Sequence, residues 1–194
     1  MSKQILLEKL NKKMLACQKC ALRATCQQVV PGEGSANAKI LFIGEGPGKK
    51  EDDLGRPFVG SAGKFLDEML AIIKLKREDV YIANVVKCRP PENRDPSPAE
   101  ALACWPWLLE QIKIIQPKLI VTLGRHSMER FLHNQKISQM HGTLVIKTIP
   151  EIGKQNFYTL YHPAAALYNG GMRETLIQDF KKIPKVLEKI EREK

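Results

Sequence analysis

Apolar residues follow two periodicities along the chain, and these predict its elements. Short apolar runs predict buried strands at residues 39–43, 80–86, 119–123, 144–146 and 157–161. Apolar residues at intervals of three and four predict helices over residues 2–16, 60–74 and 98–115, with a C-terminal helix from about Arg173. Ser97 can cap the third of these helices, and Pro98 suits its first position.

Strands that alternate with helices predict an α/β fold. We expect one domain over residues 1–194, a three-layer α/β/α sandwich with a central, mainly parallel sheet of about four strands. In such folds the active site lies beyond the carboxyl ends of the strands. The residues that follow the predicted strands are therefore candidates for the chemistry: 44–48, 84–89, 124–126 and 162–163.

Charge and composition narrow the partners. The 194 residues have a formal net charge of +10, which favours a polyanion, nucleic acid first. No apolar run approaches the roughly 20 residues of a membrane helix. The N-terminal residues lack the apolar core of a signal peptide, so we expect a cytoplasmic protein without a membrane partner.

The glycine-rich turn at residues 44–48 does not match a nucleotide-binding loop. A Walker A loop would need glycine at 43 and Ser or Thr at 50, where the chain has Ile43 and Lys50. A dinucleotide fingerprint would need glycine at position 49, where the chain has Lys49. The turn still allows the backbone to approach a ligand closely, because glycines remove the side chains there.

Several segments lie in order between Cys17 and about Leu167 and carry motifs that occur together in one family. They are Gly44-Glu45-Gly46-Pro47-Gly48, Glu51-Asp52, Gly55-Arg56-Pro57-Phe58-Val59-Gly60-Ser61-Ala62-Gly63, Asn84-Val85-Val86-Lys87-Cys88-Arg89-Pro90 and His162-Pro163-Ala164-Ala165. Together these segments resemble the family 4 uracil-DNA glycosylases, which are thermostable and contain iron and sulfur. The resemblance implies base-excision repair of uracil in single- or double-stranded DNA.

The resemblance implies a role for each strand-end residue. Phe58 would stack on a flipped uracil, and the glycines at 44 and 46 would line the base pocket. Asn84 would read the base, because one amide offers both an acceptor for N3–H and a donor for O4. His162 would donate to O2 as negative charge develops there.

The residue that orients the attacking water is left open. The best-known glycosylases of the superfamily have an aspartate where this chain has Gly46, and family 4 typically lacks it. Glu45 is the first candidate to orient water and to counter the charge on the sugar. Glu51 and Asp52 are alternatives, and a solvated acidic turn is an equally good interpretation of Asp52.

Basic and loop residues near the expected mouth are candidates for DNA contacts. Ser61 opens a helix, where free N–H groups favour a phosphate. Lys87 and Arg89, like Arg56 and Arg94, could grip phosphates or form an ordinary basic surface. Leu167 or Tyr168 could wedge into the duplex or simply pack in a loop.

Five cysteines argue against a disulfide framework. The resemblance implies a [4Fe–4S] cluster bound by Cys17, Cys20, Cys88 and Cys104, with Cys26 as a free thiol. The spacing alone leaves zinc open, although a zinc ribbon would normally show a second C-x-x-C.

Three other functions compete with uracil excision. They are a non-catalytic iron–sulfur module that binds DNA, a glycosylase for another deaminated base, and a cysteine-metal electron carrier. The first would not need Phe58, Asn84 and His162 together, and the last would not need the positive charge. We expect a monomer, since one active site serves one lesion.

Overall fold

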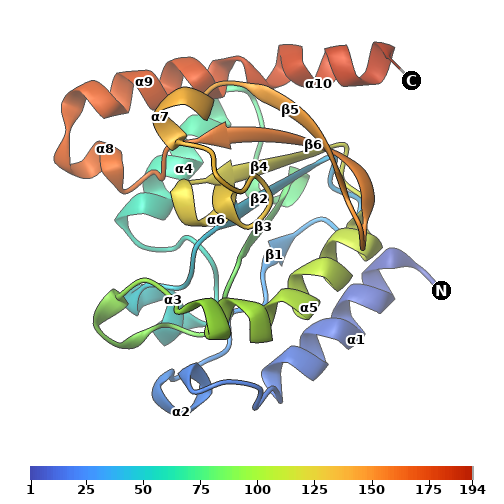
Figure 1. The fold of residues 1–194 in the computed structure, drawn as a ribbon, viewed down its shortest axis with the longest axis vertical. Helices are drawn as coiled ribbons and strands as arrows, with labels where there is room; N and C mark the ends of the chain where they lie inside the picture. Colours follow the sequence, from blue (N-terminus) through green and yellow to red (C-terminus); the bar gives the residue numbers. More distant parts are fainter. Residues whose placement is uncertain (194) are drawn as a thin grey trace.

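A single mixed sheet forms the centre of the molecule, as the computed structural model of residues 1–193 shows (Figure 1). The strand order is β1-β3-β2-β4-β6-β5. The strands are β1 Glu33–Gly34, β2 Ile40–Gly44, β3 Tyr81–Asn84, β4 Leu119–Leu123, β5 Leu144–Ile149 and β6 Gly153–Leu160. The four central strands, β3, β2, β4 and β6, are parallel. The two edge strands, β1 and β5, are antiparallel to their neighbours.

This sheet confirms the predicted α/β class and its mainly parallel character. The prediction of about four strands matches the parallel centre; of the two edge strands, β5 was predicted only at its start, residues 144–146, and β1 was not predicted. Strands β2 and β4 are buried along their whole length, as an apolar run with helices on both faces requires. The edge strand β5 alternates between more and less exposed positions, and the two-residue β1 is too short to show a pattern.

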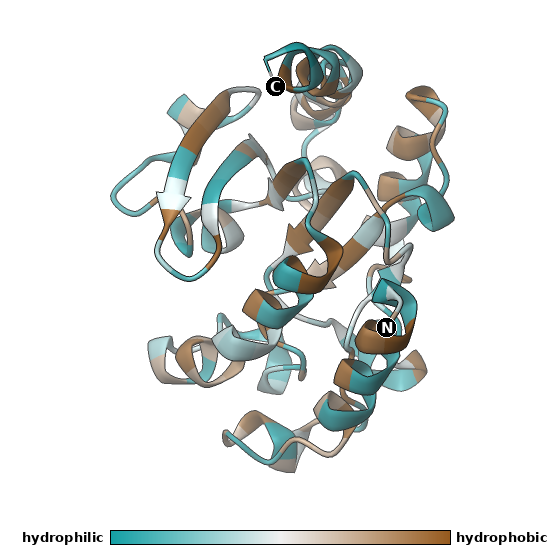
Figure 2. Cartoon of the chain, turned by 90° about the vertical axis from the view of Figure 1, so that its right-hand side faces the viewer, coloured by the Kyte–Doolittle hydropathy of each residue, from teal (hydrophilic) through white to brown (hydrophobic). Residues whose placement is uncertain are grey.

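Helices cover both faces of the sheet and produce the three layers. On one face, α1 and α5 pack against Leu41 and Ile43, and on the other, α4, α9 and α10 pack around Ile40 and Phe42. Figure 2 shows the apolar strands lying between these two helical layers. The helices are α1 Lys3–Leu15, α2 Leu22–Thr25, α3 Lys49–Leu54, α4 Ser61–Ile72, α5 Pro98–Ile115, α6 Arg125–Glu129, α7 Ile137–Met140, α8 Ala165–Tyr168, α9 Gly170–Lys181 and α10 Ile183–Arg192, with 3-10 turns at Arg77–Asp79 and Pro91–Asn93.

Three boundaries test the local sequence signals. The Ser97 hydroxyl accepts a hydrogen bond from the Glu100 backbone, and the Glu100 carboxylate accepts one from the Ser97 backbone, so the predicted cap is confirmed. Strand β3 ends at Asn84 rather than residue 86, although the N–H groups of Val85 and Val86 still donate to the carbonyls of Gly44 and Glu45. The predicted start of the C-terminal helix at Arg173 is late by three residues, since the Asn169 side chain caps α9.

No helix among residues 1–193 has the length and apolar character needed to cross a bilayer.

Candidate active site

Loops from the carboxyl ends of three parallel strands surround one cavity of about 400 Å³. The loop after β2, the end of β3 and the loop after β6 supply its walls, together with the segments around α3 and before α5. Five of the residues proposed from the sequence to bind or act on a substrate lie in this wall: Glu45, Gly46, Phe58, Asn84 and His162. The rule that strand ends carry the chemistry therefore places these side chains together, as expected.

A larger hollow of about 820 Å³ lies at the opposite edge of the sheet, near the start of β4 and the end of α5. Lys118 and Asn156 are among its lining residues. It contains none of the residues proposed from the sequence, and its composition offers no convergent set of acid, base or stacking groups. We therefore place the candidate active site in the smaller cavity.

The Phe58 ring forms one wall of the cavity in an unusual backbone conformation. Its φ is 51°, the left-handed region that a bulky residue seldom adopts. The Phe58 carbonyl accepts a hydrogen bond from Arg77 at 2.9 Å, and Gly63 leaves no Cβ where that carbonyl lies. The ring stacks against His162 with centroids 5.6 Å apart. The structure thus fixes an aromatic face beside the candidate acid–base group.

Asn84 lies at the end of β3, directly across from Gly44 in the parallel register. Its side chain is 2% exposed, and its Oδ1 has no hydrogen-bond partner among residues 1–193. A buried acceptor without a partner costs about 1–3 kcal/mol. A Cβ at position 44 would lie 2.4 Å from this oxygen, so Gly44 makes the space that the amide occupies. An unpaired acceptor in a cavity wall is suited to a ligand that brings its own donor.

His162 follows β6 and presents one ring nitrogen to the cavity. Its Nδ1 accepts a hydrogen bond from the Ala164 backbone at 3.1 Å, so in the neutral ring the proton is on Nε2. Burial lowers the pKa of His162 to about 4, against an opposing effect of the Glu51 charge. The imidazole is therefore neutral near pH 7, and its Nε2–H is a donor rather than a cation.

Glu45 belongs to a cluster of charged groups at the rim of the cavity. Its Oε2 lies 3.8 Å from His126 Nε2, which is 3.1 Å from Asp95 Oδ2. Arg125 approaches the same Asp95 oxygen at 3.2 Å. Burial raises the pKa of Glu45, and Asp95 adds to this, while His126 and Arg125 oppose it. The carboxylate is half-buried and open to the cavity, which suits a group that orients water.

The two alternative acids are committed to backbone hydrogen bonds. Glu51 accepts from the backbone N–H groups of Val59 and Gly60 at 2.8 and 2.7 Å, and thereby holds the segment after Phe58. Asp52 is buried and accepts from the backbone of Gln27 and Gln28. The interpretation of Asp52 as a solvated acid is therefore wrong, and its contacts make it a structural residue.

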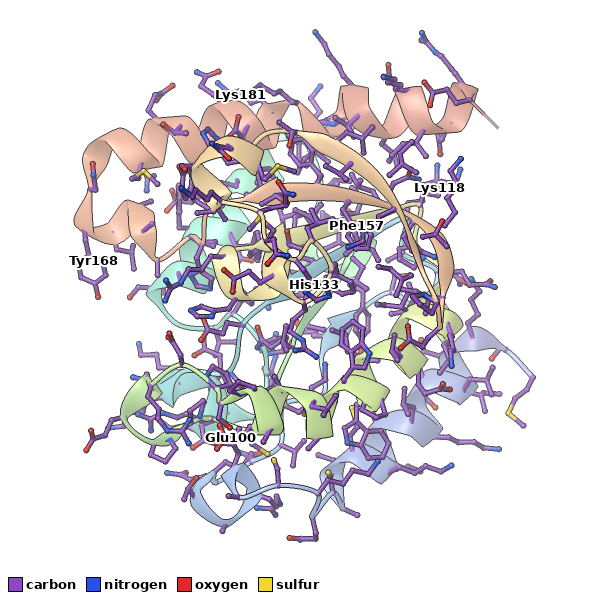
Figure 3. All side chains as sticks on the ribbon, viewed as in Figure 1. Glu100, Lys118, His133, Phe157, Tyr168 and Lys181 are labelled. Atoms are coloured by element: carbon purple, nitrogen blue, oxygen red, sulfur yellow. The ribbon has the colours of Figure 1, made fainter. Side chains whose placement is uncertain are left out.

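Most of the candidate DNA contacts lie at the surface around the cavity. Ser61 begins α4 and is exposed, and the half-buried Arg89 bonds the Asn93 side chain at 2.8 Å. Leu167 is 44% exposed and Tyr168 is 90% exposed. Tyr168 projects from the edge of the molecule on α8 (Figure 3).

The structure contradicts the prediction that Lys87 grips DNA. Its side chain is 2% exposed, and its ammonium donates to the Asn84 carbonyl at 2.8 Å and to Gln111 Oε1 at 2.7 Å. Burial lowers the pKa of Lys87 to about 8. The residue points inward because its apolar neighbours in the sequence continue the interior of the sheet. Arg56 is also engaged, in a two-bond ion pair with Glu33.

Four cysteines from distant parts of the chain line a second small cavity, with Trp107 in its wall: Cys17, Cys20, Cys88 and Cys104. Cys17 Sγ accepts from Trp107 Nε1 at 3.3 Å, and Cys104 Sγ accepts from the Lys87 backbone at 3.3 Å. Burial raises the pKa of the Cys88 thiol, and nearby thiols add to the effect. Four clustered cysteine sulfurs are suited to a cationic metal centre, which binds the thiolate form.

Cys26 is a fifth thiol close to the others. It is buried and lies beside Cys88. It is not among the residues that line the cysteine cavity.

The sequence did not reveal the role of two residues at the rim of the cavity, His126 and Asp95, or of Arg77, which bonds the Phe58 carbonyl. His126 follows β4 and was given no role from the sequence, and Asp95 lies in the loop before α5, where no periodic pattern places a side chain. The strand-end rule included residue 126, so it could have identified His126. Arg77 was missed because an arginine in a turn looks like ordinary surface.

The fold and this geometry define an α/β protein whose cavity at the carboxyl edge of the sheet is lined by an aromatic ring, an unpaired amide oxygen and an imidazole. The family model of the uracil DNA glycosylase superfamily matches residues 31–188.

Three relatives match nearly the whole chain. A type-4 uracil-DNA glycosylase of Sulfurisphaera tokodaii is 49% identical over 91% of this chain and 83% of its own length. One of Archaeoglobus fulgidus is 46% identical over 91% of both chains, and one of Thermotoga maritima is 40% identical over 97% and 98%. This chain belongs to the type-4 uracil-DNA glycosylases.

Proposed function

We propose that this chain is a uracil-DNA glycosylase, which hydrolyses the N-glycosidic bond of a flipped-out uracil and leaves an abasic site. One observation carries the proposal. The buried Asn84 amide oxygen has no partner and lies in a cavity wall shared with Phe58 and His162. Uracil N3–H is a donor for that oxygen, and uracil O4 is an acceptor for the amide N–H. Cytosine presents the reverse order and would be rejected.

The cavity accepts the base only after extraction from the helix, because the bond is out of reach inside a duplex. Phe58 offers a ring face for stacking, which contributes roughly 1–3 kcal/mol per base. Gly44 and Gly46 allow the backbone to approach that base closely, and any larger residue at 44 would displace Asn84 and Phe58.

His162 stabilises the departing base. As the bond lengthens, negative charge develops on uracil O2, and a neutral Nε2–H aimed into the cavity donates to it. The Ala164 N–H that bonds Nδ1 keeps the proton on the nitrogen that faces the base. The imidazole is a hydrogen-bond donor in this scheme and does not need to be charged.

Glu45 orients the attacking water and counters positive charge on the sugar. Its carboxylate opens onto the cavity, whereas Glu51 and Asp52 are occupied by backbone N–H groups. Position 46 is a glycine rather than an acid, so Glu45 is the residue of the loop at 45–48 that brings a carboxylate to the cavity. Asp95 and His126 would fix its orientation from the opposite side of the rim.

DNA would lie across the mouth of this cavity. Ser61 presents the N-terminus of α4 to a phosphate, and Arg89 adds a cationic side chain near the mouth. Tyr168 is exposed and lines the cavity, Leu167 is exposed beside it, and either can fill the space left by the extracted base. Single- and double-stranded DNA are both candidate substrates. The proposed enzyme works as a monomer inside the cell.

The four cysteines that line one cavity fit a [4Fe–4S] cluster. Thiolates from all four would bind it, and Trp107 N–H and the Lys87 backbone N–H donate to two of the sulfurs. When bound, the cluster supplies a cross-link between the end of α1, the chain after β3, and α5. Glycosidic hydrolysis transfers no electrons, so the cluster has no redox step in base removal.

The test is excision of uracil from an oligonucleotide, followed by alkaline cleavage at the abasic site. Wild type, Asn84→Ala and Asn37→Ala would be compared on single and double strands with uracil, thymine or cytosine. Asn37 is an exposed control at the amino edge of the sheet. Iron, acid-labile sulfide and zinc would be measured in each preparation.

Cleavage confined to uracil, lost in Asn84→Ala and kept in Asn37→Ala, would support both the activity and the role of Asn84. Uracil-specific cleavage by Asn84→Ala at the wild-type level would refute the role of Asn84 in recognising the base. No cleavage by iron-loaded wild type would refute the enzyme and favour a DNA-binding module or another damaged base. Zinc in place of iron and sulfide would refute the cluster.

A further inference from the structure

A buried lysine separates the cysteine cavity from the end of β3. Lys87 is one residue before Cys88 and three after Asn84, and it helps to line the cysteine cavity. Its backbone N–H donates to Cys104 Sγ, while its ammonium donates to the Asn84 carbonyl. One residue thus contacts both a sulfur of the candidate cluster site and the backbone of the candidate base reader.

The ammonium of Lys87 has no acidic partner. Its two acceptors, the Asn84 carbonyl and Gln111 Oε1, are uncharged, and the ion pairs of the described residues include none with Lys87. A buried charge is costly unless an opposite charge or several hydrogen bonds stabilise it. Gln111 is itself fixed by the Pro31 carbonyl and the Tyr81 hydroxyl, so the ammonium has a rigid position.

A cluster bound by four thiolates has a net negative charge, which would supply the missing counter-charge. We propose that Lys87 is a positioning residue, whose ammonium neutralises the cluster on one side and on the other holds the Asn84 backbone in register for base reading. The inference rests on the proposed function. It adds an electrostatic role for the cluster to its role as a cross-link. The cluster would influence uracil recognition through charge and geometry, with no electron transferred.

The Asn84 amide has little support besides this contact. Its Oδ1 lacks a partner, so the direction of the amide depends on how its backbone is held. The Val85 N–H donates to the Gly44 carbonyl at the end of β2 and the Val86 N–H to the Glu45 carbonyl, which fixes the chain beyond Asn84 but leaves the Asn84 carbonyl to the Lys87 ammonium. Removal of the Lys87 ammonium would therefore leave the Asn84 backbone, and with it the orientation of the Asn84 amide, less well fixed.

The test compares Lys87→Met with Lys113→Met in the iron-loaded protein. Methionine keeps most of the length and the apolar stem of lysine but has no charge, and Lys113 is an exposed control on α5. The first readout is the reduction potential of the cluster. The second is the affinity for duplexes with a non-cleavable 2′-fluoro-deoxyuridine or with thymidine at the same position.

We expect Lys87→Met to lower the reduction potential, because a nearby positive charge is lost. We also expect its preference for the uracil duplex over thymidine to fall roughly tenfold or more, since a charged hydrogen bond is removed. Lys113→Met should change neither. Lys87→Gln, which keeps an N–H donor without the charge, should show the lowered potential and recover part of the uracil preference.

The inference is overturned if loaded Lys87→Met keeps the wild-type potential or the wild-type preference for uracil. If that variant does not fold, Lys87→Gln decides by the same two readouts. Failure of the proposed function is distinct, because wild type would then show no preference for uracil or would contain no iron.

Discussion

Gly44→Ala is the substitution for which the structure gives the most specific consequence. The added methyl carbon would lie 2.4 Å from Asn84 Oδ1 and 2.6 Å from Phe58 Cζ. Comfortable contacts between heavy atoms are about 3.5 Å or longer, so each overlap is about 1 Å. Both neighbours are buried, and Phe58 is also fixed by its backbone.

Relief of this overlap requires the base reader and the stacking ring to move apart by on the order of 1 Å. A displacement of that size at reacting groups can cost about 100-fold in rate. The expected loss of stability from one extra methyl group in a packed interior is about 1–3 kcal/mol. The variant should therefore fold, bind DNA through its surface, and excise uracil about 100-fold more slowly.

Single-turnover excision with enzyme in excess measures this effect apart from product release. Thermal unfolding of the same preparation gives the change in stability. Gly170→Ala is the matched control, because a Cβ there has no neighbour within 4 Å. Wild-type excision by Gly44→Ala would contradict the geometry, and an equal loss in both variants would show that the effect is not local to the cavity.

Three further outcomes follow from the site and the fold. The kcat/KM of wild type should fall as pH falls, with an apparent pKa above 4.5, because burial and Asp95 raise the pKa of Glu45 and protonation removes its charge. The Glu45→Gln variant should lack this decrease at acid pH, and an unchanged decrease would exclude Glu45 as its source. With its pKa lowered to about 4, His162 should keep constant ring NMR shifts between pH 8 and 5.5, and a transition near 6.5 would refute the neutral donor. Ser97→Ala should reduce the free energy of unfolding by about 1 kcal/mol in urea denaturation, and an unchanged midpoint would rule out the capping contribution.

The pattern of apolar residues was sufficient to predict the strands at the parallel centre of the sheet. Strands β2 and β4 are continuous apolar runs with a glycine at one end, so their position followed from the residues alone. The edge strands followed only in part, because β1 has two residues and was not predicted, while β5 is only partly buried and was predicted over residues 144–146 alone. Their pairing depends on neighbours that are distant in sequence, which a local pattern does not contain.

The candidate site was predictable where a residue ends a strand. The strand ends placed Asn84 and His162 among the candidates, and the resemblance to family 4 supplied the roles expected of them. Lys87 shows the limit of the argument. A lysine in a basic chain is usually solvated, and only the tertiary structure shows that its ammonium points inward toward Asn84 and Gln111.

The left-handed backbone at Phe58 has a consequence for selectivity. A bulky residue in that region stores roughly 1–3 kcal/mol of strain, which Arg77, Glu51 and Gly63 hold in place. The entropy of ordering the ring is thus lost when the chain folds and not when a base arrives. The empty enzyme already has the shape of the bound one on this side, so a poorly fitting base meets a rigid wall and gains nothing by induced adjustment.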